Sequence, residues 1–147
     1  MGADAKQAAG DTSRAEFQEL LQSVLTEVDA DERAGSLLRA TGMRVRFFFP
    51  DIDSTLNVAA GEEPDDHLQW TFSDDVSWSP KLELTMDSDV ANRYLQGRES
   101  LAVAIARGRV RCRGESRIAL LYLPALRLIC DPYKRVVSSR FPHLAVA

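Results

Sequence analysis

The sequence of 147 residues contains only two cysteines and two histidines, and this scarcity argues against several classes of protein. Cys112 and Cys130 are too few for a disulfide framework in a chain of this length, so we expect both as reduced thiols. His67 and His143 have no Cys, His or carboxylate at the spacing of a metal site, so we expect no metal. The sequence has no glycine-rich loop of the phosphate-binding type. We therefore expect no cofactor.

A set of catalytic groups is also missing. Paired carboxylates do occur, at Asp51/Asp53, Asp65/Asp66, Asp74/Asp75 and Asp87/Asp89. All of them lie at predicted turns or helix caps, where Asp is common. A nucleophilic Ser or Cys would need a neighbouring base and an orienting group, and Cys112 lies in an apolar pattern with neither. We expect no catalytic residues, and an enzyme with a small pocket stays open as an alternative.

Long hydrophobic runs are absent as well. The longest, residues 118–130, has 13 residues and contains Pro124 and Arg127. A helix that spans a bilayer needs about 20 apolar residues. Residues 1–14 have neither the apolar stretch of a secretory signal nor a myristoylation pattern. We expect a cytoplasmic protein.

Charge is unevenly distributed along the chain, although the net charge is only −4. Residues 1–90 hold 7 basic and 19 acidic side chains, whereas residues 91–147 hold 11 basic and 3 acidic ones. Opposite charge on two parts of one domain draws them together, and the same surfaces would suit the interface of a homodimer. Ordinary solvated faces are the alternative.

Hydrophobic periodicity divides most of the chain into a helical start and a run of strands. Residues 1–11 show no periodicity, so we expect a disordered tail there and a single domain over residues 12–147. Ser13 and Glu16 form a capping box that opens an amphipathic helix. Alternation of period two then predicts five strands, each with one apolar face, near residues 43–49, 55–59, 67–72, 81–86 and 107–114.

Two short helices are predicted between the last two of these strands. Asp87 and Ser88 offer N-cap oxygens for the first helix, and Gly97 is placed to end it. Ser100 caps the second helix, and Gly108 ends it. This segment is a β-α-α-β crossover that is short enough to keep both strands in the same sheet.

Prolines organise the C-terminal segment. Pro124 interrupts one helix, and Asp131 followed by Pro132 predicts the start of another, so two or three short helices are expected. The fold class is therefore α+β. It comprises a five-stranded, mainly antiparallel sheet with one face covered by N- and C-terminal helices and the other face wet.

Residues 85–114, TMDSDVANRYLQGRESLAVAIARGRVRCRG, resemble the central signature of the sterol carrier protein type 2 domain family. The shared features are a strand ending in a small polar cluster, a helix ending in glycine, a short alanine-containing helix and a strand of the form G-x-(V/I)-x-x-x-G. Residues 118–137, IALLYLPALRLICDPYKRVV, are similar to the C-terminal segment of bacterial single-domain members. Upstream of residue 81 the likeness is one of topology.

The resemblance implies an apolar tunnel between the dry face of the sheet and the C-terminal helices. Its lining would comprise Phe47, Phe49, Trp70, Phe72, Leu84, Met86, Tyr94, Leu101, Ile105, Leu121, Tyr122, Leu126 and Ile129. Ordinary core packing is the alternative for each of these residues. A void of roughly 300 Å³ left empty would cost about 7 kcal/mol, so we expect a tunnel that holds lipid or is partly collapsed.

The implied function is non-catalytic binding or transfer of a fatty acid, an acyl chain or a sterol-like lipid. Two alternatives stay open: a dimerisation or assembly module that accompanies an enzyme, and a small pocket enzyme of a biosynthetic pathway.

Arginines alternate with small or apolar residues near the last predicted strand, at Arg107, Arg109, Arg111 and Arg113. Such a row would suit transient contact with an anionic membrane, plain solvation or a dimer contact. We expect no nucleic-acid binding, because the chain is acidic overall and few exposed aromatic residues accompany the arginines.

Overall fold

A computed structural model describes residues 2–146 of the chain, with side chains from residue 13 onward. The strands are β1 (Arg44–Phe49), β2 (Ser54–Ala60), β3 (Leu68–Thr71), β4 (Leu82–Met86) and β5 (Val110–Gly114). The helices are α1 (Gly2–Ala30), α2 (Glu32–Ala40), α3 (Ser88–Leu95), α4 (Leu101–Ala106), α5 (Ser116–Leu126) and α6 (Cys130–Arg140). Short 3-10 helices are η1 (Pro50–Ile52), η2 (Arg127–Ile129) and η3 (Pro142–Leu144). The tail expected over residues 1–11 lies outside the residues described in full and stays a prediction.

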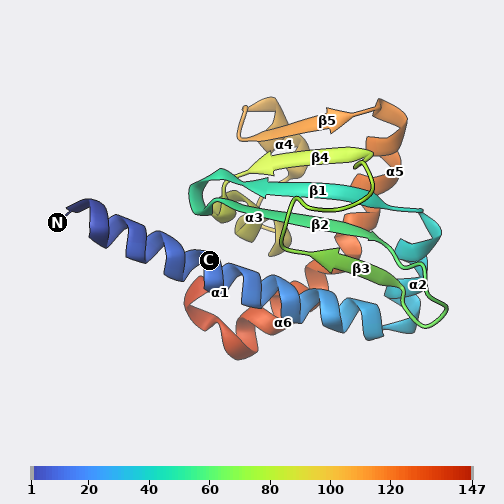
Figure 1. The fold of residues 1–147 in the computed structure, drawn as a ribbon, viewed down its shortest axis with the longest axis horizontal. Helices are drawn as coiled ribbons and strands as arrows, with labels where there is room; N and C mark the ends of the chain where they lie inside the picture. The colour runs from blue at the N-terminus through green and yellow to red at the C-terminus, as the bar shows by residue number, and fades with distance from the viewer. Residues whose placement is uncertain (1, 147) are drawn as a thin grey trace.

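The five strands form one sheet in the order β3-β2-β1-β4-β5 (Figure 1). β1 and β4 pair in parallel, and the other three pairings are antiparallel. Helices α3, α4 and α5 lie behind the sheet in Figure 1, on its dry face. The expected α+β fold with a mainly antiparallel sheet is confirmed.

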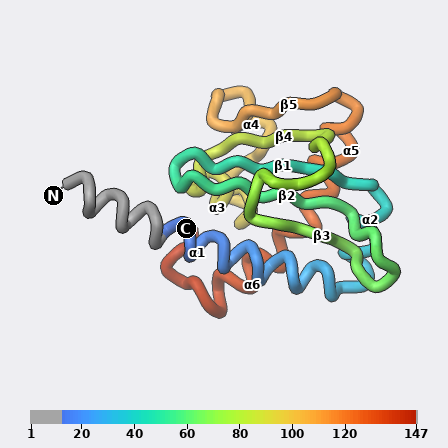
Figure 2. Tube along the Cα trace, in the orientation of Figure 1, coloured from blue at the N-terminus to red at the C-terminus, as the bar shows by residue number. Residues whose placement is uncertain are grey.

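Alternation along the strands places the apolar side chains on the covered face. Val45 pairs with Val58 and Leu82, and all three side chains are buried almost completely. On the opposite face Arg46 lies between Asn57 and Glu83 and hydrogen-bonds to both. The segment from β3 to β4 crosses this outer face (Figure 2), where the Asn57 amide donates to the Ser73 carbonyl.

The crossover between β4 and β5 consists of α3 and α4, as expected. Gly97 and Gly108 follow the two helices with φ of 75°, a conformation that favours glycine. The Ser100 hydroxyl accepts from the backbone N–H of Val103 and caps α4. Asp87 makes no such bond at the start of α3; instead Asp51 accepts from the backbone N–H of Ser88 at 2.8 Å.

The prolines act differently from the expectation. Pro124 lies inside α5, which continues to Leu126 before the chain tightens into η2. α6 begins at Cys130, so the expected N-cap at Asp131 is wrong. The physical reason is that Leu126 and Ile129 both have helical dihedral angles, so no extended residue precedes α6. Pro132 is tolerated because the first N–H groups of a helix have no intrahelical acceptor.

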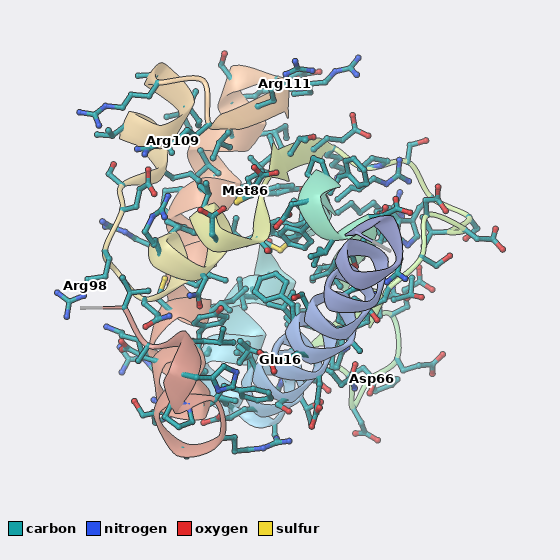
Figure 3. All side chains as sticks on the ribbon, turned by 90° about the vertical axis from the view of Figure 1, so that its left-hand side faces the viewer. Glu16, Asp66, Met86, Arg98, Arg109 and Arg111 are labelled. Atoms are coloured by element: carbon teal, nitrogen blue, oxygen red, sulfur yellow. The ribbon has the colours of Figure 1, made fainter. Side chains whose placement is uncertain are left out.

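The acidic N-terminal helix and the basic C-terminal helix are joined by ion pairs. α6 lies beside α1 (Figure 2). Among the side chains described from residue 13 onward, three basic–acidic pairs connect α1 to the C-terminal segment: Arg135 with Glu27 at 2.8 Å, Arg140 with Glu19 at 3.0 Å, and His143 with Glu16 at 2.8 Å. Figure 3 shows Glu16 and Asp66 in the lower half of the molecule and Arg109 and Arg111 at its upper end. Surface pairs contribute about 0–1 kcal/mol each, so they orient the helices more than they stabilise the fold.

Asp29 fixes the edge strand β3 to the end of α1. Its Oδ1 accepts from the backbone N–H groups of His67 and Leu68, both at 2.9 Å. The His67 ring lies against Gly35, where an added Cβ would come within 2.4 Å of Nδ1. The side chain of Asp29 therefore accepts hydrogen bonds from two backbone N–H groups at the start of β3, as the carbonyl groups of a neighbouring strand would.

We expect Asp29→Ala to lower the free energy of unfolding by about 2 kcal/mol, because it leaves two N–H groups without an acceptor. Asp29→Asn keeps an acceptor oxygen and should lose much less. Urea unfolding followed by circular dichroism measures both, with Asp65→Ala in the exposed acidic loop as the matched control. Equal stability of the Ala variant and the control would contradict this role of Asp29.

Candidate functional site

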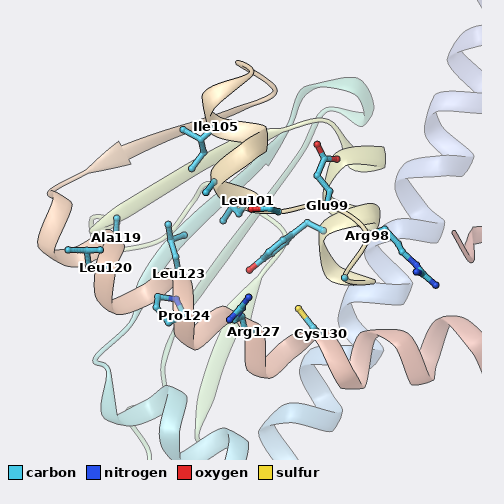
Figure 4. A pocket seen from close by; sticks show the side chains of 14 residues that line it. Arg98, Glu99, Leu101, Ile105, Ala119, Leu120, Leu123, Pro124, Arg127 and Cys130 are labelled. Atoms are coloured by element: carbon cyan, nitrogen blue, oxygen red, sulfur yellow. The ribbon is translucent and has the colours of Figure 1, made fainter. Parts of the chain in front are cut away.

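A groove of about 740 Å³ opens between α4 with the loop that precedes it and α5 with η2 (Figure 4). Its apolar lining comes mainly from the two helices: Leu101, Ala102, Ile105, Ala119, Leu120, Leu123 and Pro124. The polar residues at the groove are Tyr94, Glu99, Ser100, Arg127 and Cys130, with Arg98 at the rim, where its side chain points away from the groove. The volume lies in the range of small-molecule sites, roughly 300–1,000 Å³.

A second, much smaller hollow lies deeper, between the sheet and the helices. Its volume is about 40 Å³ and its lining is entirely apolar apart from Tyr94. That space holds no more than about three water molecules. Left empty, it costs only about 1 kcal/mol, so the helices close on the sheet with little loss of stability. Tyr94 lines both the hollow and the groove and lies between them.

The residues expected to line a tunnel are divided between these two spaces. Seven line the hollow: Phe47, Phe49, Leu84, Met86, Tyr94, Leu126 and Ile129. Leu101 and Ile105 line the groove together with Tyr94. The small hollow and the open groove share Tyr94 in their linings, and a continuous tunnel between sheet and helices stays a prediction.

Four expected lining residues lie outside both spaces. Trp70 is on the edge strand β3, and its indole N–H donates to Gln22 on α1 at 2.7 Å. Tyr122 is fully buried and its hydroxyl donates to the Gly42 carbonyl at 3.3 Å. Phe72 follows β3 and packs against the core, and Leu121 is 49% exposed.

Several lining residues were not among those expected. Leu21 and Leu25 from α1, Leu56 and Val58 from β2, and Ala91 and Leu95 from α3 complete the hollow. Ala119, Leu123 and Arg127 line the groove at a spacing of four residues, which places them on one side of a helix. The sequence contains that spacing, but residues 118–130 are apolar almost throughout, so the sequence alone does not show which face of the helix lines the groove.

Tyr94, Arg127 and Cys130 form a polar cluster within the groove. Burial raises the pKa of Tyr94 to about 12, Cys130 adds to the rise, and the charge of Arg127 opposes it. Burial also raises the pKa of the Cys130 thiol. The phenol and the thiol are therefore neutral at neutral pH, whereas a nucleophilic cysteine needs a lowered pKa.

Glu99 has its charge neutralised by two arginines. Its Oε2 lies 3.0 Å from Nε of Arg93, and its Oε1 is ion-paired with Arg109, although the geometry of that contact does not qualify as a hydrogen bond. The carboxylate side chain is only 7% exposed. This contact ties the end of α3 to the start of β5.

The row of four arginines is divided by the fold. Only Arg111 and Arg113 lie within β5, opposite Thr85 and Glu83 on the outer face of the sheet. Arg107 is the C-cap residue of α4, and Arg109 is committed to Glu99. Within residues 2–146, no helix is long and apolar enough to cross a membrane, and no three His, Cys, Asp or Glu side chains gather as a metal site would need.

No protein-family model and no curated protein matches the chain. Among solved structures, the apo form of sterol carrier protein 2 from Yarrowia lipolytica matches at 13% identity with a TM-score of 0.56, over 84% of this chain and 93% of that one. UbiJ-SCP2, a ubiquinone synthesis protein, matches at 13% identity and a TM-score of 0.54, over 80% and 91%. The sec-alkylsulfatase Pisa1 from Pseudomonas sp. matches 60% of this chain at 12% identity, with a TM-score of 0.48. The chain spans only 13% of the length of that enzyme, and the match is too weak to bear on the fold or the function.

A one-sided mixed sheet with a β-α-α-β crossover and a C-terminal helical cover is thus the architecture behind the match to the two SCP2 structures. The chain folds as a sterol carrier protein 2-like domain, as its residues 85–114 indicated.

All three tyrosines of the protein should resist ionisation while it is folded. Burial raises the pKa of Tyr94, Tyr122 and Tyr133 above the ordinary value of about 10. Absorbance at the tyrosinate band should show no step near pH 10 in buffer and all three ionisations there in strong denaturant. Because the raised values favour the neutral folded form, the contribution of the tyrosines to stability should be constant below about pH 10 and fall as the pH rises toward 12. A step near pH 10 in the folded protein would refute this burial.

Proposed function

We propose that the protein binds a small apolar or amphiphilic molecule in the groove between α4 and α5 and carries it without chemical conversion. The observation that carries this proposal is an open groove of about 740 Å³ with apolar side chains on both walls, in a fold shared with sterol carrier protein 2. A ligand that covers Leu101, Ile105 and Leu123 gains about 25 cal/mol for each Å² of apolar surface removed from water.

The inner hollow is proposed as a reserve into which the apolar end of a ligand extends. Its floor is made of sheet residues such as Leu84 and Met86, and its cover includes Leu126 and Ile129 at the junction of α5 and η2. Short helical segments separate from a sheet more easily than a continuous helix does, since each makes few contacts. Movement at this junction would connect the hollow with the groove.

The chemistry of the groove supports binding and transport of a ligand rather than catalysis. Cys130 has a raised pKa, Glu99 is held by two arginines, and neither histidine lines the groove. We also propose a cytoplasmic site of action and transient contact with an anionic membrane during transfer. The exposed arginines at and before β5, Arg107, Arg111 and Arg113, support this contact. A homodimer stays a prediction from the charge distribution.

Filling the groove should weaken binding. We expect Ala119→Trp to weaken the binding of a long-chain fluorescent fatty-acid analogue by about tenfold or more, because the indole occupies the volume beside Leu123. Fluorescence titration measures the affinity. Ala40→Trp, at the exposed end of α2, is the matched control and should bind as the unchanged protein does. Absence of saturable binding by the unchanged protein would overturn the proposed function.

A further inference from the structure

Arg127 is an uncommitted charge at the open side of a largely apolar groove. It is the first residue of η2, and Figure 4 shows its side chain pointing into the groove. Within residues 13–146, whose side chains are described, its guanidinium has no hydrogen bond and no ion pair. The carboxylate of Glu99, which also lines the groove, is ion-paired with Arg93 and Arg109 and not with Arg127.

The other arginine at the groove is oriented differently. Arg98 follows Gly97 in the loop before α4, and its side chain extends away from the groove into solvent (Figures 3 and 4). The two arginines are therefore chemically equivalent but only one of them faces the interior of the groove. Arg98 provides the matched control for Arg127.

A neutral hydrogen-bond donor lies next to Arg127. Tyr94, Arg127 and Cys130 all line the same groove. The Tyr94 hydroxyl makes no hydrogen bond to another described residue, so its proton is available to an acceptor. A guanidinium donates two parallel N–H bonds to a carboxylate or phosphate, and a phenol adds a third donor.

We infer that Arg127, with Tyr94, is the head-group site of the groove and that the ligand is a long-chain amphiphile with an anionic head. This inference rests on the proposed function. The head, a carboxylate or a phosphate monoester, would pair with Arg127 and accept from the Tyr94 hydroxyl, and the chain would run away from them along Leu123, Leu101 and Ile105. An uncharged ligand of the same length would cover the guanidinium without pairing it, which costs affinity.

Three ligands with the same C16 chain test the inference: hexadecanoate, hexadecyl phosphate and hexadecanol, each displacing a fluorescent probe. We expect the unchanged protein to prefer at least one of the two anions over the alcohol by about tenfold. Arg127→Gln should remove most of that preference and leave the affinity for hexadecanol within about twofold. Arg98→Gln should keep the preference. The two anions distinguish a carboxylate head from a phosphate head.

The outcomes separate this inference from the proposed function. Equal binding of the three ligands, unchanged in Arg127→Gln, would overturn the head-group site and leave an apolar carrier. A preference lost equally in Arg98→Gln would also overturn it, because general charge rather than the groove would then be responsible. Binding of none of the three would overturn the proposed function itself. Tyr94→Phe removes only the hydroxyl and should weaken anion binding by about threefold, with hexadecanol unaffected.

Discussion

The apolar face of the sheet must be covered, and the cover over β4 and β5 is made of short helical segments. α1 packs with six buried apolar side chains, from Phe17 to Val28, and one of them meets Phe49 on β1 edge to face. The other cover changes from α5 to the 3-10 helix η2 after Leu126. Buried Val and Leu side chains such as Val45 and Leu84 contribute about 1.5–3 kcal/mol each, so exposing this face is costly. The long helix α1 therefore covers one part of the apolar face, and the shorter segments α5 and η2 cover another.

That difference explains why the two spaces in the protein are so unequal. Between the sheet and the helices the side chains close until about 40 Å³ remains, because an empty apolar cavity has a cost that grows with its volume. Between α4 and α5 no such pressure acts, since the groove is open to water. An open groove next to a collapsed hollow holds less strain than a permanent tunnel would. It also places Tyr94 as the boundary that a ligand must displace to reach the interior.

Most of the fold could be predicted because strand alternation is a strong local signal. It gave five strands and the correct inward residues, such as Phe47 and Leu84. It could not show where each strand lies across the sheet. Trp70 faces the covered side but belongs to the edge strand β3, where it meets α1 instead of the hollow. Position within the sheet depends on pairing between distant strands, which periodicity along one strand does not report.

The candidate site was harder to predict because residues 118–130 are apolar almost throughout. A helix whose apolar residues cover all sides gives no preferred face. Leu120 and Tyr122 are two residues apart, yet the first is 77% exposed at the edge of the groove and the second is fully buried. Arg127 interrupts this run, but the sequence does not show which way its side chain points, because that depends on which helix lies beside it. The structure supplies that neighbour in the form of α3 and its Tyr94.

The position of Arg127 also bears on how a carrier would release its ligand. A charge buried fully with its partner gives tight binding, and removing either member is then strongly unfavourable. Arg127 is exposed to water at the open side of the groove, so an ion pair formed there competes with hydration. Such a pair selects an anionic head without holding it irreversibly. Selectivity would come from the guanidinium, while most of the affinity would come from apolar contact with α4 and α5, and the ligand could leave through the groove without unfolding of the sheet.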